Sequence, residues 1–528
     1  MNIKANIVFR SLMTQTLGHY CHATSKESIY DILFSELAVW RRWSTNMRKA
    51  KIVCTIGPAS STPAILSRLI ESGMNAARLN FSHGTPASHA AAITAIREAA
   101  DRHGSAVAII QDLQGPRIRV GLLPKDGVEV SAGQVVQLRT STEPGGRSDA
   151  QPSAPPSALE IPVTYPALTR DLRPGARVLI NDGLVELIAD RVMDTRIDCT
   201  VVIGGRITSH KGINLPGTVV SAPALTDKDR DDIRFGVAHR VDYVALSFVR
   251  GPQDVDAARA LLAEHGSQIP IIAKIERAEA VQSLAEILDH ADGVMIARGD
   301  LGVEMGPEAV PVLQKRIILE ANRQRRLVIT ATQMLESMTQ ATRPTRAEAS
   351  DVANAIFDGT DAVMLSAETA VGCYPVETVR VMDRIILAAE EEVEPGVTLK
   401  RQTDMENLSF PEAICTAAAS AAKSVAASAI VAFSERGTTA RLISKQRPSA
   451  PIIALTPFEP VRLQMALYWG VRPYTTPQIE QTDARVEEAE RRLKSEGLGK
   501  AGETIVILSG TRVGQPGGTN LIKLHVVS

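Results

Sequence analysis

The sequence predicts an α/β protein: a (β/α)8 TIM barrel with an inserted small β-barrel lid domain and a C-terminal α/β domain. Three observations lead to this prediction. Eight short apolar runs recur between residues 51 and 369, and most are followed by an alanine-rich segment of helical period. A β-rich stretch, residues 118–216, separates the third run from the fourth. A second alternation of strand-like and helical segments begins after residue 395.

The eight apolar runs predict the strands of the barrel. Near-continuous apolar strands that alternate with helices are typical of a parallel sheet covered on both faces, and eight such units are the number in a (β/α)8 barrel. In order, the runs are KIVCTIG (51–57), AARLNFSHG (76–84), AVAIIQDLQG (106–115), VDYVALSF (241–248), IPIIAKIE (269–276), GVMIARGD (293–300), RLVITAT (326–332) and DAVMLSAET (361–369).

The interrupting stretch predicts a small β-barrel. Its strand-like segments are separated by Gly, Pro and Asp turns. An insertion after the third strand lies over the carboxyl-terminal mouth of the barrel, where it can act as a lid. Residues 142–158 form a Pro/Ser/Gly-rich loop for which we expect no function of its own. After residue 393, four strand-like runs interleave with helices, and LIKLHVV (521–527) reads as an edge strand.

These observations divide the 528 residues into four parts. Residues 48–117 and 217–392 are expected to form the barrel, 118–216 the lid domain and 393–528 the C-terminal domain. Residues 1–47 are expected to be an extension, either disordered or upstream of the natural start at Met47, and a weak targeting role stays open.

Composition excludes several classes of protein. The hydrophobic content of 44% and formal net charge of −1 fit a globular protein and argue against a nucleic-acid or anionic-membrane partner. The five cysteines are scattered without a C-x-x-C pair, so neither a disulfide framework nor a zinc site is predicted. No run approaches the ~18 apolar residues of a membrane span. We therefore expect a cytoplasmic protein.

The active site of a (β/α)8 enzyme lies at the carboxyl ends of its strands. An arginine or carboxylate there could alone form a structural ion pair, but the whole ring predicts an active site. Its members are Arg78, Asn80, Ser82, Asp112, Arg117, Arg119, Lys274, Glu276, Arg298, Asp300, Thr332, Ser366 and Glu368.

Three of these residues indicate a metal-assisted reaction. Lys274 and Glu276 are two apart on a strand, so their side chains point the same way, and Asp300 ends the next strand. Two carboxylates with few other ligands suit Mg²⁺, although an ion-pair network with Lys274 is the alternative. Phosphoryl transfer depends on such groups: a lysine, arginines, a magnesium ion and a Gly-flanked loop that together neutralise and position the phosphoryl oxygens. No Walker A motif is present, because Ala501 follows the only Gly-Lys pair.

A series of motifs along the chain closely resembles the pyruvate kinase family. In order they are KIVCTIGPAS, RLNFSHG, QDLQGPRIRVG, KGINLPG, KIE, ARGDLGVE, ATQMLESM, PTRAEASDVANAIFDGTDAVML and SAETAVGCYP. The similarity runs from about residue 48 to the C-terminus and is most specific over 48–390. It implies transfer of the phosphoryl group of phosphoenolpyruvate to ADP, giving pyruvate and ATP in glycolysis, by a homotetramer.

The resemblance also implies roles for individual residues. Lys274 would neutralise the transferring phosphoryl group, and Glu276 and Asp300 would hold Mg²⁺ or Mn²⁺. Thr332 is our preferred source, through a water, of the proton that the enolate takes up. Substrate would be bound by Arg78, Ala297, Arg298, Gly299, Asp300 and Thr332. Nucleotide would be bound by Asn80, Phe81, Ser82, His83, Arg119 and Lys211.

Two residues predict that potassium is not required. Family members that need K⁺ bind it through oxygens at the positions of Asn80, Ser82, Asp112 and the next residue, which here is Leu113. They carry glutamate at the position of Arg117, whose guanidinium would supply the missing positive charge. Core packing is the other explanation of Leu113, and Gln114 could still offer an oxygen.

The C-terminal domain resembles the effector domain of the family. SERGTTAR (434–441) joins a strand to a helix, where a phosphate of an allosteric effector could bind. The expected contacts are Ser434, Arg436, Thr438 and Thr439, with the Gly-rich segment 509–520 closing over them. The segment departs from the order found in fructose-bisphosphate-activated members, so we expect a sugar monophosphate or nucleoside monophosphate. An ordinary turn is the alternative.

Two other functions remain open from the sequence. A catalytically silent relative that senses a sugar phosphate would need a defect in residues such as Lys274 or Thr332, which are intact. A metal-dependent lyase acting on oxoacids would share the metal pair. It would not account for the inserted lid or for Arg119 and Lys211.

Overall fold

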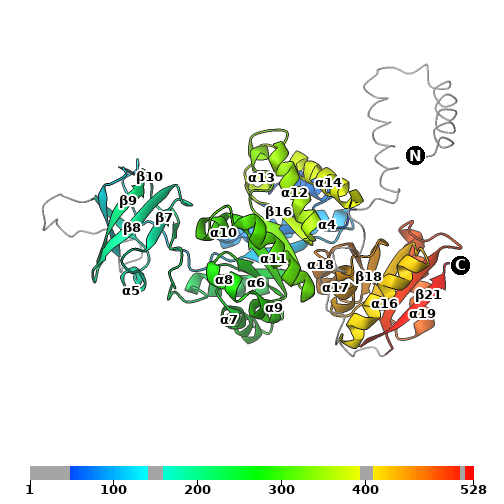
Figure 1. The fold of residues 1–528 in the computed structure, drawn as a ribbon. Helices are drawn as coiled ribbons and strands as arrows, with labels where there is room; N and C mark the ends of the chain where they lie inside the picture. Colours follow the sequence, from blue (N-terminus) through cyan, green and yellow to red (C-terminus); the bar gives the residue numbers. More distant parts are fainter. Residues whose placement is uncertain (1–47, 141–158, 393–407, 512–517) are drawn as a thin grey trace, which may run out of the picture. The chain divides into compact units, whose positions relative to one another are not determined.

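The computed structural model describes residues 48–140, 159–392, 408–511 and 518–528. Eight parallel strands close into a barrel in the order β1-β16-β15-β14-β13-β12-β3-β2, which confirms the predicted fold class (Figure 1). Each strand coincides with one of the eight apolar runs. Their bounds are β1 Lys51–Thr55, β2 Ala76–Asn80, β3 Ala108–Asp112, β12 Tyr243–Leu246, β13 Ile271–Ile275, β14 Gly293–Ala297, β15 Leu327–Ala331 and β16 Ala362–Leu365.

Helices cover the outside of the barrel, and local sequence signals start and stop them. Helix α12 (Arg346–Asp358) begins at a capping box between Thr345 and Glu348 and ends at Gly359, whose φ of 93° suits glycine. The other covering helices are α3 (Pro63–Glu71), α4 (Pro86–Arg102), α6 (Asp227–Ala238), α7 (Pro252–Glu264), α8 (Ala278–Gln282), α9 (Leu284–His290), α10 (Arg298–Met305), α11 (Val310–Arg323) and α14 (Pro375–Glu392).

The apolar core at the amino end of the barrel is shared with the C-terminal domain. Strand side chains such as Ile110 and Met295 form an apolar cluster that also contains Ala466 and Leu467, which follow helix α18 (Glu459–Met465). The hydroxyl of Tyr243 donates to the carbonyl oxygen of Gln464 at 2.9 Å. The amino end of the barrel is therefore closed by residues from the C-terminal domain.

The inserted residues form a six-stranded sheet, in the order β11-β7-β8-β9-β5-β6, and a two-stranded sheet of β10 and β4. Residues 118–121 join the two edges of the larger sheet through bridges of Arg119 to Gly212 and of Val120 to Val163. The expected loop at 142–158 lies outside the described residues. The bounds are β4 Val128–Val130, β5 Val135–Thr140, β6 Leu159–Val163, β7 Arg177–Ile180, β8 Val185–Val192, β9 Arg196–Ile203, β10 Gly205–Ile207 and β11 Ile213–Asn214, with α5 at Leu168–Asp171.

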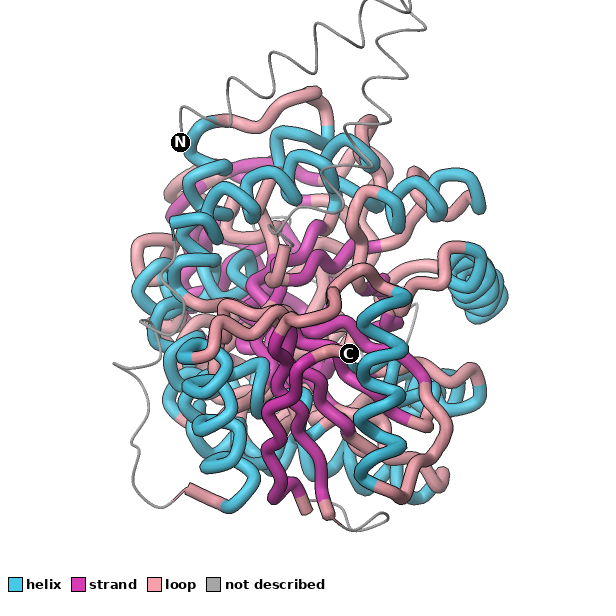
Figure 2. Tube along the Cα trace, turned by 90° about the vertical axis from the view of Figure 1, so that its right-hand side faces the viewer, coloured by secondary structure: helices cyan, strands magenta, loops and turns pink. Residues whose placement is uncertain are grey.

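The C-terminal domain is a five-stranded sheet in the order β19-β18-β17-β20-β21, with helices packed along it (Figure 2). The predicted edge strand is β21, which pairs antiparallel with β20. Its elements are α16 (Phe410–Ser424), β17 (Ala429–Phe433), α17 (Thr438–Lys445), β18 (Ile452–Thr456), α18, β19 (Val471–Thr475), α19 (Thr482–Ser495), β20 (Thr504–Gly510) and β21 (Thr519–Val526). The predicted extension, residues 1–47, lies outside the described residues.

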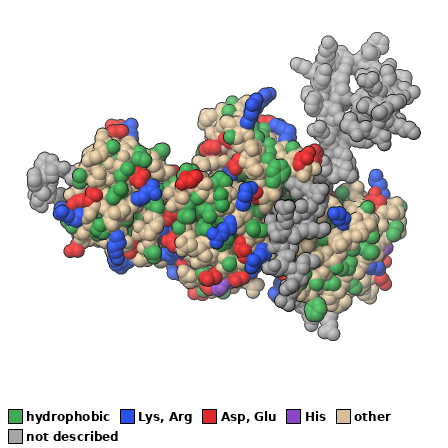
Figure 3. Space-filling view, in the orientation of Figure 1, with side chains coloured by type: hydrophobic (Ala, Val, Ile, Leu, Met, Phe, Trp, Pro, Cys, Tyr) green, Lys and Arg blue, Asp and Glu red, His purple; other side chains and the backbone are tan. Residues whose placement is uncertain are grey.

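A buried ion cluster fastens this domain to the barrel. Asp361, directly before β16, accepts hydrogen bonds from Lys445 at 2.5 Å and Arg447 at 2.9 Å, and it is 1% exposed. Burial lowers the pKa of Lys445 to about 8, against the opposing effect of Asp361. The surface is different: acidic and basic side chains are interspersed over the face seen in Figure 3. Among the described helices, none combines the length and apolar character needed to cross a membrane.

Candidate active site

A chain of opposite charges lies at the carboxyl ends of β2, β3 and β13. The Nε of Arg78 donates to Oδ2 of Asp112 at 2.6 Å. The Nζ of Lys274 lies 3.2 Å from Oδ1 of Asp112 and 2.9 Å from Oε1 of Glu276. None of these four charged side chains is more than 12% exposed. Lys274 and Glu276 point the same way, as expected, and they form the ion pair that the sequence left as the alternative to a metal site.

The surrounding opposite charges favour the ionised forms of Asp112 and Lys274. Burial alone would raise the pKa of Asp112, but Arg78 and Lys274 together lower it. Burial alone would lower the pKa of Lys274, yet Asp112 and Glu276 outweigh it and raise that pKa. Lys274 is thus a positively charged group in a largely buried site, where its field is weakly screened.

Glu276 and Asp300 provide two carboxylates at the position expected for a divalent ion. Burial raises the pKa of Glu276; Lys274 opposes the shift and the nearby charge of Asp300 adds to it. Oε2 of Glu276 accepts the Phe248 N–H at 2.6 Å, while Oε1 lies 2.9 Å from Nζ of Lys274.

This arrangement fits Mg²⁺ or Mn²⁺. No group of three or more His, Cys, Asp or Glu side chains in the described parts of the chain could hold a metal ion. A divalent ion would therefore take one or two carboxylates and fill its other positions with water or substrate oxygens, as Mg²⁺ commonly does.

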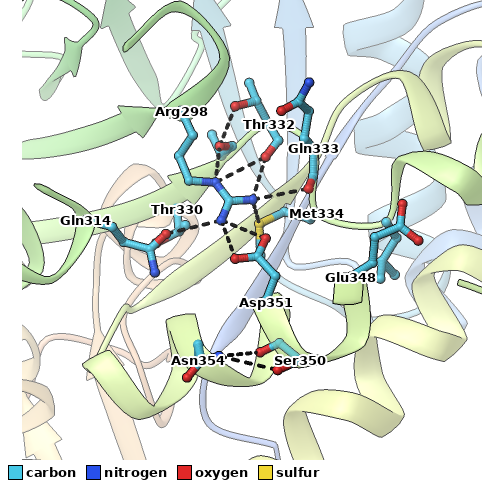
Figure 4. A network of polar contacts seen from close by, with 12 residues as sticks. Arg298, Gln314, Thr330, Thr332, Gln333, Met334, Glu348, Ser350, Asp351 and Asn354 are labelled. Carbon is cyan, nitrogen blue, oxygen red and sulfur yellow. Dashed lines mark hydrogen bonds and ion pairs between the residues drawn. The ribbon is translucent and has the colours of Figure 1, made fainter. Parts of the chain in front are cut away.

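Thr332 follows β15 and bonds to the first turn of α10. The Gly299 N–H donates to Oγ1 of Thr332 at 2.8 Å. The guanidinium of Arg298 lies in a network with Asp351 and the loop that follows β15 (Figure 4). The structure thus brings Gly299 and Thr332 together, but it does not bring the side chain of Arg298 to the charged cluster.

The residues expected on the nucleotide side are spread over two elements. Phe81 is 3% exposed and its ring stacks on His89, so its side chain belongs to the core. His83 and Lys211 are exposed. Arg119 donates to the carbonyl oxygen of His210, next to Lys211.

Leu113 had two explanations, core packing and the absence of a potassium ligand, and its surroundings bear on the first. Leu113 is 1% exposed and belongs to the main apolar cluster, so core packing holds its side chain. The Nη2 of Arg117 lies 3.5 Å from Asp182 of the inserted sheet and 3.9 Å from Asp300. Oδ1 of Asn80 accepts the Ser82 N–H at 3.1 Å.

The sequence did not single out Ser247, at the end of the fourth barrel strand. Its hydroxyl accepts from Nζ of Lys274 at 2.7 Å and donates to the carbonyl oxygen of Leu113 at 2.7 Å. The only signal was its place after the apolar run VDYVAL. Glu368, which was included in the ring, is instead buried in the short helix α13 (Ala367–Ala370), where it accepts the Leu335 and Ser366 N–H groups.

Comparisons with known proteins agree with this geometry. Residues 47–379 match the family model described as pyruvate kinase, barrel domain, and residues 412–525 match the one described as pyruvate kinase, alpha/beta domain. The chain belongs to the pyruvate kinase family.

Relatives in this family align over most of the chain. The pyruvate kinase of Geobacillus stearothermophilus is 46% identical over 91% of this chain and 81% of its own length. Pyruvate kinase 2 of Synechocystis is 44% identical over 91% of this chain and 79% of its own. A solved pyruvate kinase structure from Cryptosporidium parvum has a TM-score of 0.84 and 38% identity, covering 91% of this chain and 96% of that one.

Membership and coverage establish the reaction. The chain is a phosphotransferase with pyruvate kinase activity, which transfers the phosphoryl group of phosphoenolpyruvate to ADP. Pyruvate kinases use divalent metal ions, which agrees with the paired carboxylates.

A pocket lies in the C-terminal domain. It is formed where β17 meets α17, and all four residues expected to bind an effector line it. Ser434 and Thr439 are buried, and the Thr439 N–H donates to Oγ of Ser434 at 3.2 Å. Glu435 also lines the pocket. Thr476, Arg485 and Thr519 line it as well, and the hydroxyls of Thr439 and Thr519 lie 2.6 Å apart. Of the Gly-rich segment expected to cover it, residues 512–517 lie outside the described residues.

Proposed function

We propose that Lys274 stabilises the phosphoryl group in transfer, and that Glu276 and Asp300 hold the Mg²⁺ or Mn²⁺ of the reaction. One observation carries this proposal: the buried ammonium group of Lys274 lies 2.9 Å from Oε1 of Glu276, and Asp300 is close enough for its charge to raise the pKa of Glu276. When bound, the divalent ion supplies positive charge that offsets the charge of the phosphoryl oxygens.

The residues around this cluster would orient the substrate. Arg78 would bind the phosphate, because its Nε and Nη1 are fixed by Asp112 and Thr55. Ala297, Gly299 and Asp300 would face the substrate carboxylate with the backbone at the start of α10. Thr332 would deliver the proton to the enolate through a water.

The nucleotide would bind on the side of the inserted domain. Arg119 and Lys211 lie on neighbouring backbone segments, since the Val120 N–H donates to the carbonyl oxygen of Lys211. Both would contact the phosphates of ADP, with residues 80–83 beside them. Closure of the inserted domain would then complete the site only when nucleotide is present.

Arg117 would take the place of potassium. Its guanidinium lies 3.9 Å from Asp300, and Leu113 offers no side-chain oxygen for an ion. The test is pyruvate formation from phosphoenolpyruvate and ADP with Mg²⁺, in potassium-free buffer and with potassium added. Equal turnover in both supports the proposal, whereas activity only with potassium contradicts the role of Arg117.

The pocket in the C-terminal domain would bind the phosphate of an allosteric effector, a sugar monophosphate or nucleoside monophosphate. Ser434, Arg436, Thr438 and Thr439 surround the amino end of α17, which favours an anion. Ribose 5-phosphate, glucose 6-phosphate and AMP should each be tested for a change in the saturation curve of phosphoenolpyruvate. If none changes it, the effector proposal is wrong.

The enzyme would work as a homotetramer in the cytoplasm. Light scattering of the purified protein would measure the assembly, and a stable monomer with full activity would contradict it.

A further inference from the structure

The guanidinium of Arg298 lies against the backbone of the loop after β15 (Figure 4). Its Nε donates to the carbonyl oxygens of Ala331 and Thr332, each at 3.2 Å. Its Nη2 donates to the carbonyl oxygens of Thr332 at 2.7 Å and Gln333 at 3.3 Å. Three successive carbonyl oxygens therefore converge on one side chain, which is 9% exposed.

This loop has a backbone that needs support. Thr332 has a φ of 69° and Gln333 a φ of 52°, so two consecutive residues other than glycine are left-handed. This region is disfavoured for residues with a Cβ, and most strongly for a β-branched one such as Thr332. Such a conformation persists only where its surroundings hold it. Arg298 is suited to do so, because it binds the carbonyl oxygens on both sides of the strained residues.

The same arrangement fixes the hydroxyl of Thr332. Its Oγ1 accepts the Gly299 N–H at 2.8 Å and donates to the carbonyl oxygen of Ala331 at 2.6 Å. The side chain of Arg298 thus holds the backbone of Thr332, and the backbone N–H of Gly299, the next residue of α10, holds the side chain of Thr332. A shift of the loop would move the hydroxyl away from Gly299.

Two helices hold the guanidinium in turn. The Nη1 of Arg298 donates to Oδ1 of Asp351 on α12 at 2.8 Å, and Oδ2 lies 2.7 Å away. It also donates to Oε1 of Gln314 on α11 at 3.2 Å. A planar fork bonded on three edges has one orientation, which an ammonium group cannot reproduce.

We propose that Arg298 is a positioning residue for phosphoryl transfer, with Asp351 as its anchor. It locks Thr332 and Gln333 in the left-handed conformation and thereby sets the hydroxyl of Thr332 at the substrate. This inference rests on the role proposed above for Thr332. Direct hydrogen bonds link Asp351 of α12 through Arg298 to the backbone of Thr332.

The first test is Arg298→Lys, which keeps the positive charge and loses the planar set of guanidinium N–H donors. We expect kcat to fall ~10–100-fold while KM for ADP changes less than ~3-fold, because the loop is misplaced and the nucleotide side is untouched. Asp351→Asn should give a smaller loss of kcat in the same direction, and it keeps the test usable if Arg298→Lys fails to fold. Arg97→Lys is the matched control, since Arg97 also bonds a carbonyl oxygen and a carboxylate but lies at the opposite end of the strands.

A double-mutant cycle separates this inference from the role of Thr332. If Arg298 acts through Thr332, Arg298→Lys should lower kcat little further in a Thr332→Ala background. If the two substitutions lower kcat additively, the inference is wrong. It is also wrong if Thr332→Ala lowers kcat and Arg298→Lys does not. A Thr332→Ala enzyme with normal kcat would instead overturn the role proposed for Thr332.

Hydrogen exchange supplies a readout that does not depend on catalysis. Arg298→Lys should speed exchange of the amides of residues 332–335 relative to wild type, and Arg97→Lys should not. Unchanged exchange in Arg298→Lys would show that other contacts hold the loop, and the inference would be wrong.

Discussion

Glu276 is a residue at which stability and function oppose each other. Its carboxylate is buried beside Asp300, and its pKa is raised mainly by burial, so its charge is costly in the protein without a metal. We expect Glu276→Gln to lower kcat by ~100-fold or more while leaving Tm unchanged or higher. Direct Mn²⁺ binding to the variant should weaken in parallel. A variant that binds Mn²⁺ normally would contradict the metal-binding role.

Arg117 offers a prediction about ion requirement. In Leu113→Thr/Arg117→Glu, an oxygen and a carboxylate replace an apolar group and a fixed cation. We expect activity to depend on added K⁺, with at least ~10-fold activation, because the site then lacks the positive charge of the guanidinium. Arg139→Glu is the control, since that arginine is exposed in the inserted sheet. Equal activity of the double variant with and without K⁺ would sink the proposal.

The sequence predicted where the functional residues lie better than it predicted where their side chains point. Lys274 and Glu276 were paired correctly, because alternation along a strand fixes the direction of both. Arg298 comes directly after a strand, where the turn into α10 sends its side chain beneath the neighbouring loop. Ser247 became visible only when the barrel closed and placed β12 beside β13.

At the scale of the elements, the barrel strands were predictable because each is a short apolar run between polar residues. The covering helices were harder to predict in detail. The segment between β13 and β14 is divided into α8 and α9 at Ser283, and no proline or glycine marks this break. The inserted sheet was predicted as a barrel, but its closure depends on residues 118–121 bridging two strands that are distant in sequence.

Helix α12 allows a prediction about an element. Its capping box joins Thr345 to Glu348, and Glu348 also accepts bonds from Ser337 in the turn after β15. Thr345→Ala should destabilise the protein by about 1 kcal/mol through loss of the cap, with little change in kcat. Glu348→Ala should cost more, because it also frees Ser337. Equal thermal unfolding of the two variants would show that the contact with Ser337 adds nothing.

At the scale of the whole molecule, the contact between the barrel and the C-terminal domain contains buried lysines. The Nζ of Lys51 in β1 donates to the carbonyl oxygen of Val471 in β19 at 2.7 Å. Burial, together with nearby arginines, lowers the pKa of Lys51 from 10.5 to about 7. Lys445, bound to Asp361, has a pKa lowered to about 8 by the same cause. This interface therefore changes its charge within the neutral to alkaline range.

The sign of the resulting pH dependence follows from proton binding. Between the folded pKa of Lys51, about 7, and its ordinary value of 10.5, the unfolded chain holds a proton that the folded chain has released. Unfolding then takes up a proton, so a rise in pH within this window stabilises the folded state. The gain from Lys51 alone can reach ~1.4 kcal/mol per pH unit.

Lys51→Met tests this account, because it removes the titrating group and keeps the length of the side chain. We expect wild type to gain Tm relative to Lys51→Met as pH rises from 7 to 9.5, at a fixed heating rate, whatever the difference between them at pH 7. Lys423→Met, which changes an exposed lysine on α16, should run parallel to wild type. If the curves of wild type and Lys51→Met are parallel across this range, Lys51 keeps its ordinary pKa, and the contact between the domains does not respond to pH through this residue.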